Sequence, residues 1–366
     1  MKSPMSGKAG SRFAGKKLLI LLIAFPFLAA SCDTGDIFDF GGGTRGVFKS
    51  EDNGETYISA SRLVSKGDIS NYSINTFAFD PNNPEILYAG SNNGIHKSED
   101  GAKSWKYILS GIAVASIAVD KFSSSTVYAA GIVGQNGKII KSVDSGSSWV
   151  DTYTEPSKNN SVLAVGVSSS STSTILAGLN NGELIRSTDS GRTWQATKDF
   201  SDRVIKVTFG PTSTAYALTA KKGLYKSDDL GVTWMPLSDS LSGNTLNSVN
   251  KSATSVTAFY DLGLDLRQAG VLYLGTEEGL YRSVNEGQDW SFIALPLKNA
   301  ALRISAVSVN PGNSNNLFAS VASTIYKSTN GGLTWETKTL PTSSTVRTIV
   351  INPVSSNIIY LGLRSQ

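Results

Sequence analysis

The stretch at residues 187–194 reads Ser187-Thr188-Asp189-Ser190-Gly191-Arg192-Thr193-Trp194, and it recurs along the chain. A second complete copy runs from Ser227 to Trp234, and all six tryptophans of the chain end a copy of this phrase. A seventh copy ends in Tyr57. The basic residue before each copy recurs at intervals of 48, 44, 45, 40, 56 and 45 residues, a period typical of repeat proteins. We call this phrase the eight-residue motif.

Each motif follows short runs of alternating apolar and polar residues. Ahead of the motif that ends at Trp105, these runs cover residues 76–81, 86–90 and 94–98. Later repeats restate the second run with an aromatic residue at the same place, as in Leu272-Tyr273-Leu274-Gly275, and show no helical period. Together with one strand after the motif, each repeat has four short strands. Four-stranded sheets repeated at this spacing predict the blades of a β-propeller.

The two ends of the repeat array complete each other. The first motif, residues 50–57, has no first or second strand before it. The last repeat has these two strands, Thr348 to Asn352 and Ile358 to Gly362, and ends at Gln366 without a third strand or a motif. We therefore predict an all-β fold, a single seven-bladed β-propeller of four-stranded blades, whose last blade is closed by both termini.

The motif resembles the Asp-box, also called the BNR repeat. Asp-boxes occur in sialidases, sortilin-type receptors, xyloglucan-cleaving glycoside hydrolases and the photosystem II assembly factor family, and the resemblance covers about residues 44–366. This chain departs from the pattern at Asn285 and Asn330 in place of Asp, at Ala102 in place of Gly, and at Asp289 in place of Thr. Each replacement keeps a short acceptor or a turn-compatible residue.

We interpret the motif as the hairpin turn between the third and fourth strands of a blade. The Asp or Asn oxygen accepts backbone N–H groups, glycine takes a positive φ, and the tryptophan packs against its own blade. An array of carboxylates also suggests calcium, but Asn285 and Asn330 keep the turn hydrogen bond while discarding ligand charge, so we expect no metal. In Asp-box families these turns lie at the blade periphery, which implies a structural role for Asp52, Asp100, Asp144, Asp189, Asp229, Asn285, Asn330, Trp105, Trp149, Trp194, Trp234, Trp290 and Trp335.

The N-terminus has the pattern of a targeting segment. Five cations precede an apolar stretch, Leu18 to Ala30, that is too short to span a bilayer. The sole cysteine, Cys32, follows Leu28-Ala29-Ala30-Ser31, which resembles the lipobox of bacterial lipoproteins. The resemblance implies an extracytoplasmic protein, periplasmic or at the cell surface, that is anchored to membrane lipid through Cys32. An ordinary secreted protein with a free cysteine is the alternative.

These observations divide the chain into three parts. The predicted parts are a lipoprotein signal peptide at residues 1–31, a lipidated Cys32 with a flexible tether at 32–45, and the propeller at 46–366.

Composition excludes several function classes. The chain has 33 Lys and Arg against 29 Asp and Glu, but five of the cations lie in the first 31 residues. The remainder is near neutral, so we do not expect nucleic acid as a partner. One histidine and one cysteine argue against imidazole catalysis and thiolate metal sites. His96 aligns with Phe, Ile and Tyr of other repeats, so we interpret it as a strand side chain, and we expect no cofactor.

The candidate functional face lies opposite the motif turns, where loops join strands two and three. The candidate binding residues are Lys221, Lys222, Glu277 and Glu278 in the turns of adjacent repeats and Tyr260 on the inner strand of the fifth blade. In a glycoside hydrolase, Asp261 with Glu277 or Glu278 would form the acid pair, about 5 to 5.5 Å or 6.5 to 9.5 Å apart. The simpler interpretation is a solvated turn and a strand-edge charge.

We expect a non-catalytic, lipid-anchored platform for protein interaction or assembly at a bacterial membrane. Its size, single ring and anchor resemble the photosystem II assembly factor family, whose role would imply a membrane protein as partner. The alternative is a surface glycoside hydrolase or polysaccharide-binding lipoprotein, although xyloglucan-cleaving relatives usually need two propellers. No arginine triad with a Phe-Arg-Ile-Pro sequence appears, which argues against a sialidase. Peptide capture inside the ring, as in sortilin-type receptors, is a third hypothesis.

Overall fold

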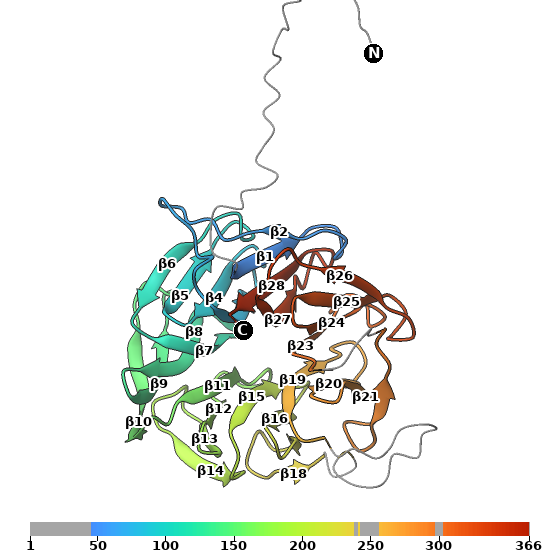
Figure 1. Ribbon diagram of the computed structural model, residues 1–366. Coiled ribbons are helices and arrows are strands. Elements are labelled where there is room, and N and C mark those ends of the chain that lie inside the picture. Colours follow the sequence, from blue (N-terminus) through green and yellow to red (C-terminus); the bar gives the residue numbers. More distant parts are fainter. Residues whose placement is uncertain (1–44, 238–240, 242–255, 297–302, 366) are drawn as a thin grey trace, which may run out of the picture. The chain divides into compact units, whose positions relative to one another are not determined.

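The structure, a computed structural model, describes residues 45–237, 241, 256–296 and 303–365. These residues form seven antiparallel sheets of four strands, arranged as blades in a ring (Figure 1). The predicted fold, a seven-bladed β-propeller, is confirmed. Cys32, the predicted signal peptide and nearly all of the predicted tether lie outside the described residues. Within the described ranges, no helix is long and apolar enough to cross a membrane.

The strands of each blade follow one another in sequence, except in the blade that joins the chain ends. Blades one to four are β3 (Ile74–Phe79), β4 (Leu87–Ser91), β5 (Gly94–Ser98) and β6 (Lys106–Ser110); β7 (Ala113–Asp120), β8 (Ser123–Val133), β9 (Asn136–Ser142) and β10 (Val150–Lys158); β11 (Val162–Val167), β12 (Ile175–Leu179), β13 (Glu183–Ser187) and β14 (Gln195–Asp199); and β15 (Val204–Phe209), β16 (Ala215–Thr219), β17 (Leu224–Ser227) and β18 (Met235–Pro236). Blades five to seven are β19 (Phe259–Leu264), β20 (Leu272–Thr276), β21 (Leu280–Ser283) and β22 (Ser291–Ile293); β23 (Ala306–Val309), β24 (Leu317–Val321), β25 (Thr324–Ser328) and β26 (Glu336–Thr339); and β27 (Thr345–Ile351), β28 (Ile359–Arg364), β1 (Gly46–Ser50) and β2 (Ile58–Ser59).

Blade seven joins the two ends of the ring by backbone hydrogen bonds. β1 pairs antiparallel with β28, from Gly46 opposite Leu363 to Ser50 opposite Ile359. The blue β1 and the red β28 lie side by side in Figure 1, and the sheet order is β2-β1-β28-β27. The predicted closure is therefore confirmed, and it removes the free sheet edges that would otherwise invite association with other chains.

The apolar core is divided among the interfaces between neighbouring blades. Between blades seven and one, for example, Val47 and Tyr360 pack with Ile74 and Trp105. The second strands β4, β12, β16 and β20 are buried along their whole length. Because both of their faces meet protein, their residues are mainly apolar and do not alternate with polar ones. Each blade therefore needs its two neighbours to bury its faces.

Tyrosines on second strands tie a blade to the motif of the next blade. The hydroxyl of Tyr88 donates to Ser145 O at 3.1 Å, and that of Tyr128 donates to Ser190 O at 3.0 Å. Tyr360 makes the same contact across the closure, to Gly101 O at 3.2 Å. These bonds satisfy buried hydroxyls and fix the angle between blades.

Hydrogen bonds within the motif explain its residue pattern. In the copy at 187–194, Ser187 Oγ donates to Asp189 Oδ1 at 2.8 Å and accepts the N–H of Gly191 at 2.8 Å. Asp189 then accepts the N–H and the hydroxyl of Thr193, at 2.9 and 2.6 Å. The Thr193 hydroxyl and N–H lower the pKa of Asp189 to about 2. Gly191 has a φ of +85°, which glycine adopts without strain.

Two departures from the motif compensate each other in blade five. Asn285 Oδ1 accepts the N–H of Asp289 at 2.9 Å, as Asp does elsewhere, while Asn285 Nδ2 donates to Asp289 Oδ2 at 2.8 Å. Donor and acceptor have changed places relative to the Asp–Thr pair. In blade six, Asn330 Nδ2 and Thr334 Oγ1 are 2.8 Å apart. The Asp289 carboxylate therefore accepts the amide N–H of Asn285, as the Thr334 hydroxyl does for Asn330.

Trp105 and Trp290 cluster with residues of their own blades, but the tryptophan N–H groups differ in their acceptors. Trp194 Nε1 donates to Gly191 O of its own motif at 3.2 Å, and Trp149, Trp234 and Trp335 do the same in theirs. Trp105 is fully buried and donates to Ala60 O at 2.7 Å, whereas Trp290 donates to Leu237 O at 3.1 Å. Both of these acceptors belong to segments that precede the tryptophan's own blade. Such segments do not repeat from blade to blade, so the repeat pattern does not predict them.

The exchanged pair of blade five makes a testable prediction. Asn285→Asp places two carboxylates at hydrogen-bond distance and removes a donor, so it should lower the free energy of unfolding by about 1 to 2 kcal/mol. Asp289→Thr alone should be nearly neutral, because it recreates the Asn–Thr pair of blade six. The double variant restores the common Asp–Thr pair and should recover stability in thermal unfolding. Equal stability of Asn285→Asp and the double variant would contradict the assignment.

Candidate functional site

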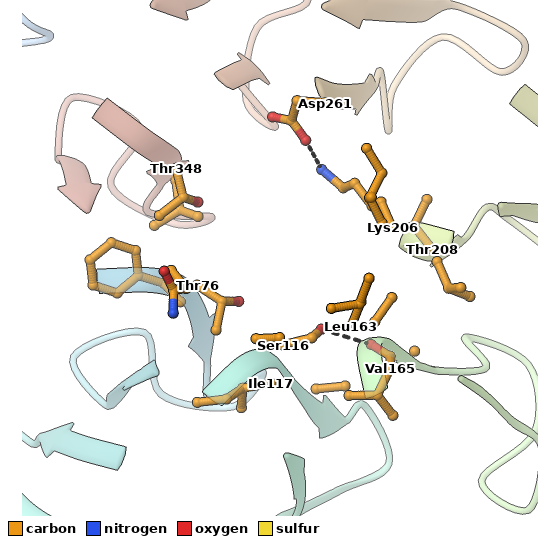
Figure 2. Close-up of a pocket in the computed structure, with 18 of the residues that line it drawn as sticks. Thr76, Ser116, Ile117, Leu163, Val165, Lys206, Thr208, Asp261 and Thr348 are labelled. Carbon is orange, nitrogen blue, oxygen red and sulfur yellow. Dashed lines mark hydrogen bonds and ion pairs between the residues drawn. The ribbon is translucent and has the colours of Figure 1, made fainter. Parts of the chain in front are cut away.

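The inner strands of the seven blades enclose a central channel. β3, β7, β11, β15, β19, β23 and β27 line it, and its volume is about 420 Å³ (Figure 2). A ligand pocket commonly has a volume of about 300 to 1,000 Å³, so the channel has room for a few side chains or one sugar ring. The polar side chains in it come from different blades and lie close together only because the ring is closed.

A bulge recurs near the start of the inner strands. Their pairing shifts by one residue after the first or second pair, for example between Val204 and Lys206 and between Phe259 and Asp261. The same shift occurs in blades one, two, three and seven. The extra residue in each case lines the channel: Asn75, Ala115, Leu163, Ile205, Tyr260 and Arg347. Bulges of this kind re-aim side chains beside functional sites.

Asp261 links three blades through its carboxylate. Oδ1 accepts Lys206 Nζ of blade four at 2.6 Å, and Oδ2 accepts the N–H of Val307 of blade six at 2.8 Å (Figure 2). Lys206 Nζ also donates to Leu262 O at 2.8 Å. Both carboxylate oxygens therefore have a partner. This arrangement suits a residue that holds blades together better than one that must take up and release a proton.

Other residues in or next to the inner strands also bond to the next blade. Asn75 Nδ2 donates to Val114 O at 2.8 Å, and Ser305 Oγ donates to Val346 O at 2.8 Å. Ser116 Oγ approaches Val165 O at 3.3 Å. These contacts place the Lys206–Asp261 pair in a ring of polar bonds between neighbouring blades.

Three arginines gather at the end of the channel where the inner strands begin. The Arg303 guanidinium lies 4.3 Å from the centre of the Tyr260 ring, a cation–π distance. Arg347 lines the channel, and Arg364 lies opposite Thr345, two residues before Arg347. Burial lowers the pKa of Arg364, and the positive charges of Arg347 and Arg303 lower it further. We call these three residues the arginine cluster; crowded guanidiniums of this kind suit an anion, especially a carboxylate.

The structure places the predicted site residues in two groups. Tyr260 and Asp261 line the channel, but Glu277 and Glu278 do not. Glu277 is exposed in the turn between β20 and β21 and accepts the Thr257 hydroxyl at 3.1 Å. Glu278 donates its N–H to Thr276 Oγ1 in the same turn, at 3.1 Å. The arrangement does not bring a glutamate into the channel beside Asp261.

Lys221 and Lys222 lie in the turn between β16 and β17 with exposed side chains. Their backbone N–H groups donate to Asp202 Oδ2 at 2.5 and 2.9 Å. Because turns between second and third strands flank the beginning of the inner strands, these lysines lie on the same face as Tyr260.

His96 and the motif carboxylates do not form a reactive centre. His96 is buried, Nε2 lies 3.3 Å from Ser91 Oγ, and burial lowers its pKa to about 4. Across the described ranges, no group of three or more His, Cys, Asp or Glu side chains is placed to hold a metal ion.

Sequence reasoning missed the arginine cluster. A sialidase-type arginine triad is expected next to a Phe-Arg-Ile-Pro sequence, which this chain does not contain. The three arginines come instead from blades six and seven. An alignment of the inner strands would have found part of it, since Tyr260 and Arg347 share the bulge position. Arg364 could not be found in that way, because it lies on a second strand.

Comparisons with known proteins support the architecture. No protein-family model matches the sequence, and a search of curated proteins finds no match. The GH74 xyloglucanase from Xanthomonas campestris is similar in structure, with 17% identity and a TM-score of 0.63, over 82% of this chain and 52% of that chain. YCF48 bound to D1 peptide is similar with 16% identity and a TM-score of 0.61, over 83% of this chain and 94% of that chain.

YCF48 from Cyanidioschyzon merolae is also similar, with 13% identity and a TM-score of 0.59, over 80% of this chain and 95% of that chain. The chain spans about half the length of the GH74 enzymes that it matches. At these identities the similarity establishes the propeller fold alone.

The contacts of Asp261 predict its contribution to stability. Asp261→Ala leaves the Val307 N–H without its partner and Lys206 without its counter-ion, so the free energy of unfolding should fall by about 2 kcal/mol. Asp261→Asn keeps an acceptor for the Val307 N–H and should cost about half as much. Denaturant unfolding measures both, with the exposed Glu277→Ala as the control. If Asp261→Ala matched Glu277→Ala, Asp261 would not act as a link between blades.

Proposed function

We propose that the protein is a non-catalytic binding platform, and that its channel mouth binds an acidic segment of a partner protein. The observation that carries the proposal is the arginine cluster beside Tyr260 at an open end of the ring. Arg303 and Tyr260 offer a charged and an aromatic surface together, and Arg347 continues the positive charge into the channel. Side chains with these properties are frequent at protein interfaces.

The state of the channel carboxylate supports binding over hydrolysis. A glycosidase needs a proton donor and a second carboxylate facing the same bond. Asp261 is held by Lys206 and by the Val307 N–H, and neither Glu277 nor Glu278 lines the channel. The described tryptophans are also engaged in motif and core contacts, which leaves Tyr260 as the aromatic side chain beside the arginines.

The structural relatives offer both kinds of function. One is a propeller whose structure contains a bound peptide, and the chain spans nearly all of it. The GH74 enzymes are glycoside hydrolases, and the chain spans half of each. The first relationship favours a peptide or protein ligand for a single ring. We further propose that the motif turns are Asp-boxes, and that lipid on Cys32 holds the ring at a bacterial membrane with a membrane protein as its partner.

The arginine cluster makes the central prediction. Tagged protein should recover a stoichiometric partner from detergent-solubilised host membranes after mild cross-linking. Arg303→Gln combined with Arg347→Gln should reduce recovery at least tenfold, because each lost charge-assisted contact costs about 1.5 to 3 kcal/mol. Arg203→Gln is the matched control, since Arg203 and Arg303 are both exposed arginines that precede an inner strand, β15 and β23 respectively. Equal recovery by all three proteins would exclude the cluster as the binding site.

The glycoside hydrolase alternative is tested by an activity assay. Purified protein incubated with xyloglucan should release no reducing ends. Release of reducing ends by wild type, with loss of that activity in Asp261→Asn, would replace the platform by an enzyme.

Anchoring is tested separately. Cys32→Ser should move the protein from the membrane fraction to the soluble fraction and abolish metabolic labelling with a radioactive fatty acid. The propeller is unaffected by this change, so thermal unfolding should be the same. Membrane association that persists in Cys32→Ser without label would show that another feature binds the membrane.

A further inference from the structure

A basic residue precedes every motif, and in four blades it forms an ion pair. Lys49 and Lys97 pair with the second residue of their own motif, Glu51 at 2.6 Å and Glu99 at 3.0 Å. The other two lysines pair with a carboxylate of the next blade, and Lys226 also pairs within its own motif. Lys226 pairs with Asp228 at 2.8 Å and with Glu286, the fourth residue of the next motif, at 2.7 Å; Lys327 pairs with Glu55, the sixth residue of the next motif.

Blade two lacks an acid at all three of these positions. Its lysine is Lys141, and the corresponding residues are Val143, Ser190 and Arg192. Arg192 thus occupies the place from which Glu55 neutralises Lys327. Lys141 Nζ donates to Ser190 O at 3.0 Å and lies 5.3 Å from the centre of the Tyr128 ring. Burial lowers the pKa of Lys141, the charge of Arg192 adds to the effect, and the charge of Asp120, which forms no ion pair with Lys141, opposes it in part.

These residues line a groove between blades two and three. It has a volume of about 420 Å³ and is bounded by Lys141, Val143, Val150, Asp151, Thr152, Ser190, Gly191 and Arg192. Asp151 is paired with Lys138, so it does not neutralise Lys141. Val143 and Val150 are large apolar side chains with 62% and 61% of their surface exposed. The groove therefore combines two cations with an apolar rim. We call it the Lys141 groove.

Arg186 and Arg282 also lack an acid at the corresponding positions, but they differ from Lys141. Arg186 Nε donates to Leu230 O at 2.9 Å, and the sixth residue of the next motif is Val232. Arg282 lies 5.9 Å from the Tyr273 ring, and the sixth residue of the next motif is Leu333. Neither has a second cation where Lys141 has Arg192.

We propose that the Lys141 groove is a second binding site, which holds a carboxylate of an acidic segment of a partner protein between Lys141 and Arg192, with an aliphatic neighbour against Val143 and Val150. The carboxylate takes the place of the acid that other blades supply from their own chain. A segment of protein fits better than a free small anion, because the exposed valines gain contact only from an apolar side chain. This site is independent of the channel mouth.

Binding is measured with the peptide acetyl-Ser-Leu-Glu-Leu-Ser-amide as the probe. Methyl resonances of isotope-labelled valine report locally, since Val150 lies in the groove and Val307 and Val350 line the channel. We expect saturable shifts of Val150 with a Kd in the millimolar range or tighter. The same peptide with Gln in place of Glu should bind at least fivefold more weakly. Acetate alone should also bind at least fivefold more weakly, because it lacks the aliphatic neighbours.

The decisive variant is Val143→Glu, which gives blade two the Lys–Glu pair of blade one. It should keep or raise the melting temperature and weaken peptide binding at Val150 at least fivefold, as Lys141→Met and Arg192→Gln should. Arg347→Gln is the control and should leave the Val150 shifts unchanged. The proposal is overturned if Val150 does not respond to the peptide, if Val143→Glu binds as wild type does, or if acetate binds as tightly as the peptide.

Discussion

The backbone ladder between β1 and β28 is the interaction on which the rest of the structure depends. The blades bury their apolar faces only against one another, so an open array would leave the faces of its two end blades in water. Pairing of Gly46 with Leu363 and of Ser50 with Ile359 joins the ends of the array. Arg364 lies one residue beyond this ladder, opposite Thr345 of β27 in the same sheet. Closure therefore stabilises the fold, and the blade that it completes carries Arg347 and Arg364.

Seven similar blades make a regular ring, and function is expected where the repeats differ. The regular positions carry the bonds that hold every blade, such as the Ser187–Asp189–Thr193 network. At the bulge of the inner strand the residues differ from blade to blade, and there Tyr260 and Arg347 enter the channel. The same reasoning applies outside the channel, where Lys141 differs from the lysines of other blades that form ion pairs. Repetition provides an internal reference for each departure.

Much of the fold could be predicted from the sequence because the signals were local. The motif spacing predicted seven blades, and the unpaired strands at the two ends predicted the closing blade. The motif pattern also predicted the turn bonds, although the exchange between Asn285 and Asp289 required the geometry. The hydrogen bonds of Trp105 and Trp290 Nε1 could not be predicted, because their acceptors, Ala60 and Leu237, lie in irregular segments. Local patterns contain no information about such partners.

The candidate site was predictable only in part, because its contacts join distant segments. Tyr260 and Asp261 were nominated correctly as inner-strand residues, but the partners of Asp261 are Lys206 and Val307, from the blades on either side. The sequence does not show whether the two oxygens of a carboxylate already accept hydrogen bonds, as those of Asp261 do. That distinction decides between an acid catalyst and a structural link.

The two cationic sites occur on a chain that is near neutral outside its first 31 residues. At physiological ionic strength the Debye length is about 8 Å, so charges farther apart than this are largely screened. With little net charge, the ring does not attract acidic proteins from a distance. In the proposed function, Arg303, Arg347 and Arg364 bind groups that enter the channel mouth, and in the further proposal Lys141 and Arg192 bind a carboxylate that enters their groove. Under these proposals a partner is selected by the fit of its carboxylates to the two sites, and its net charge contributes little.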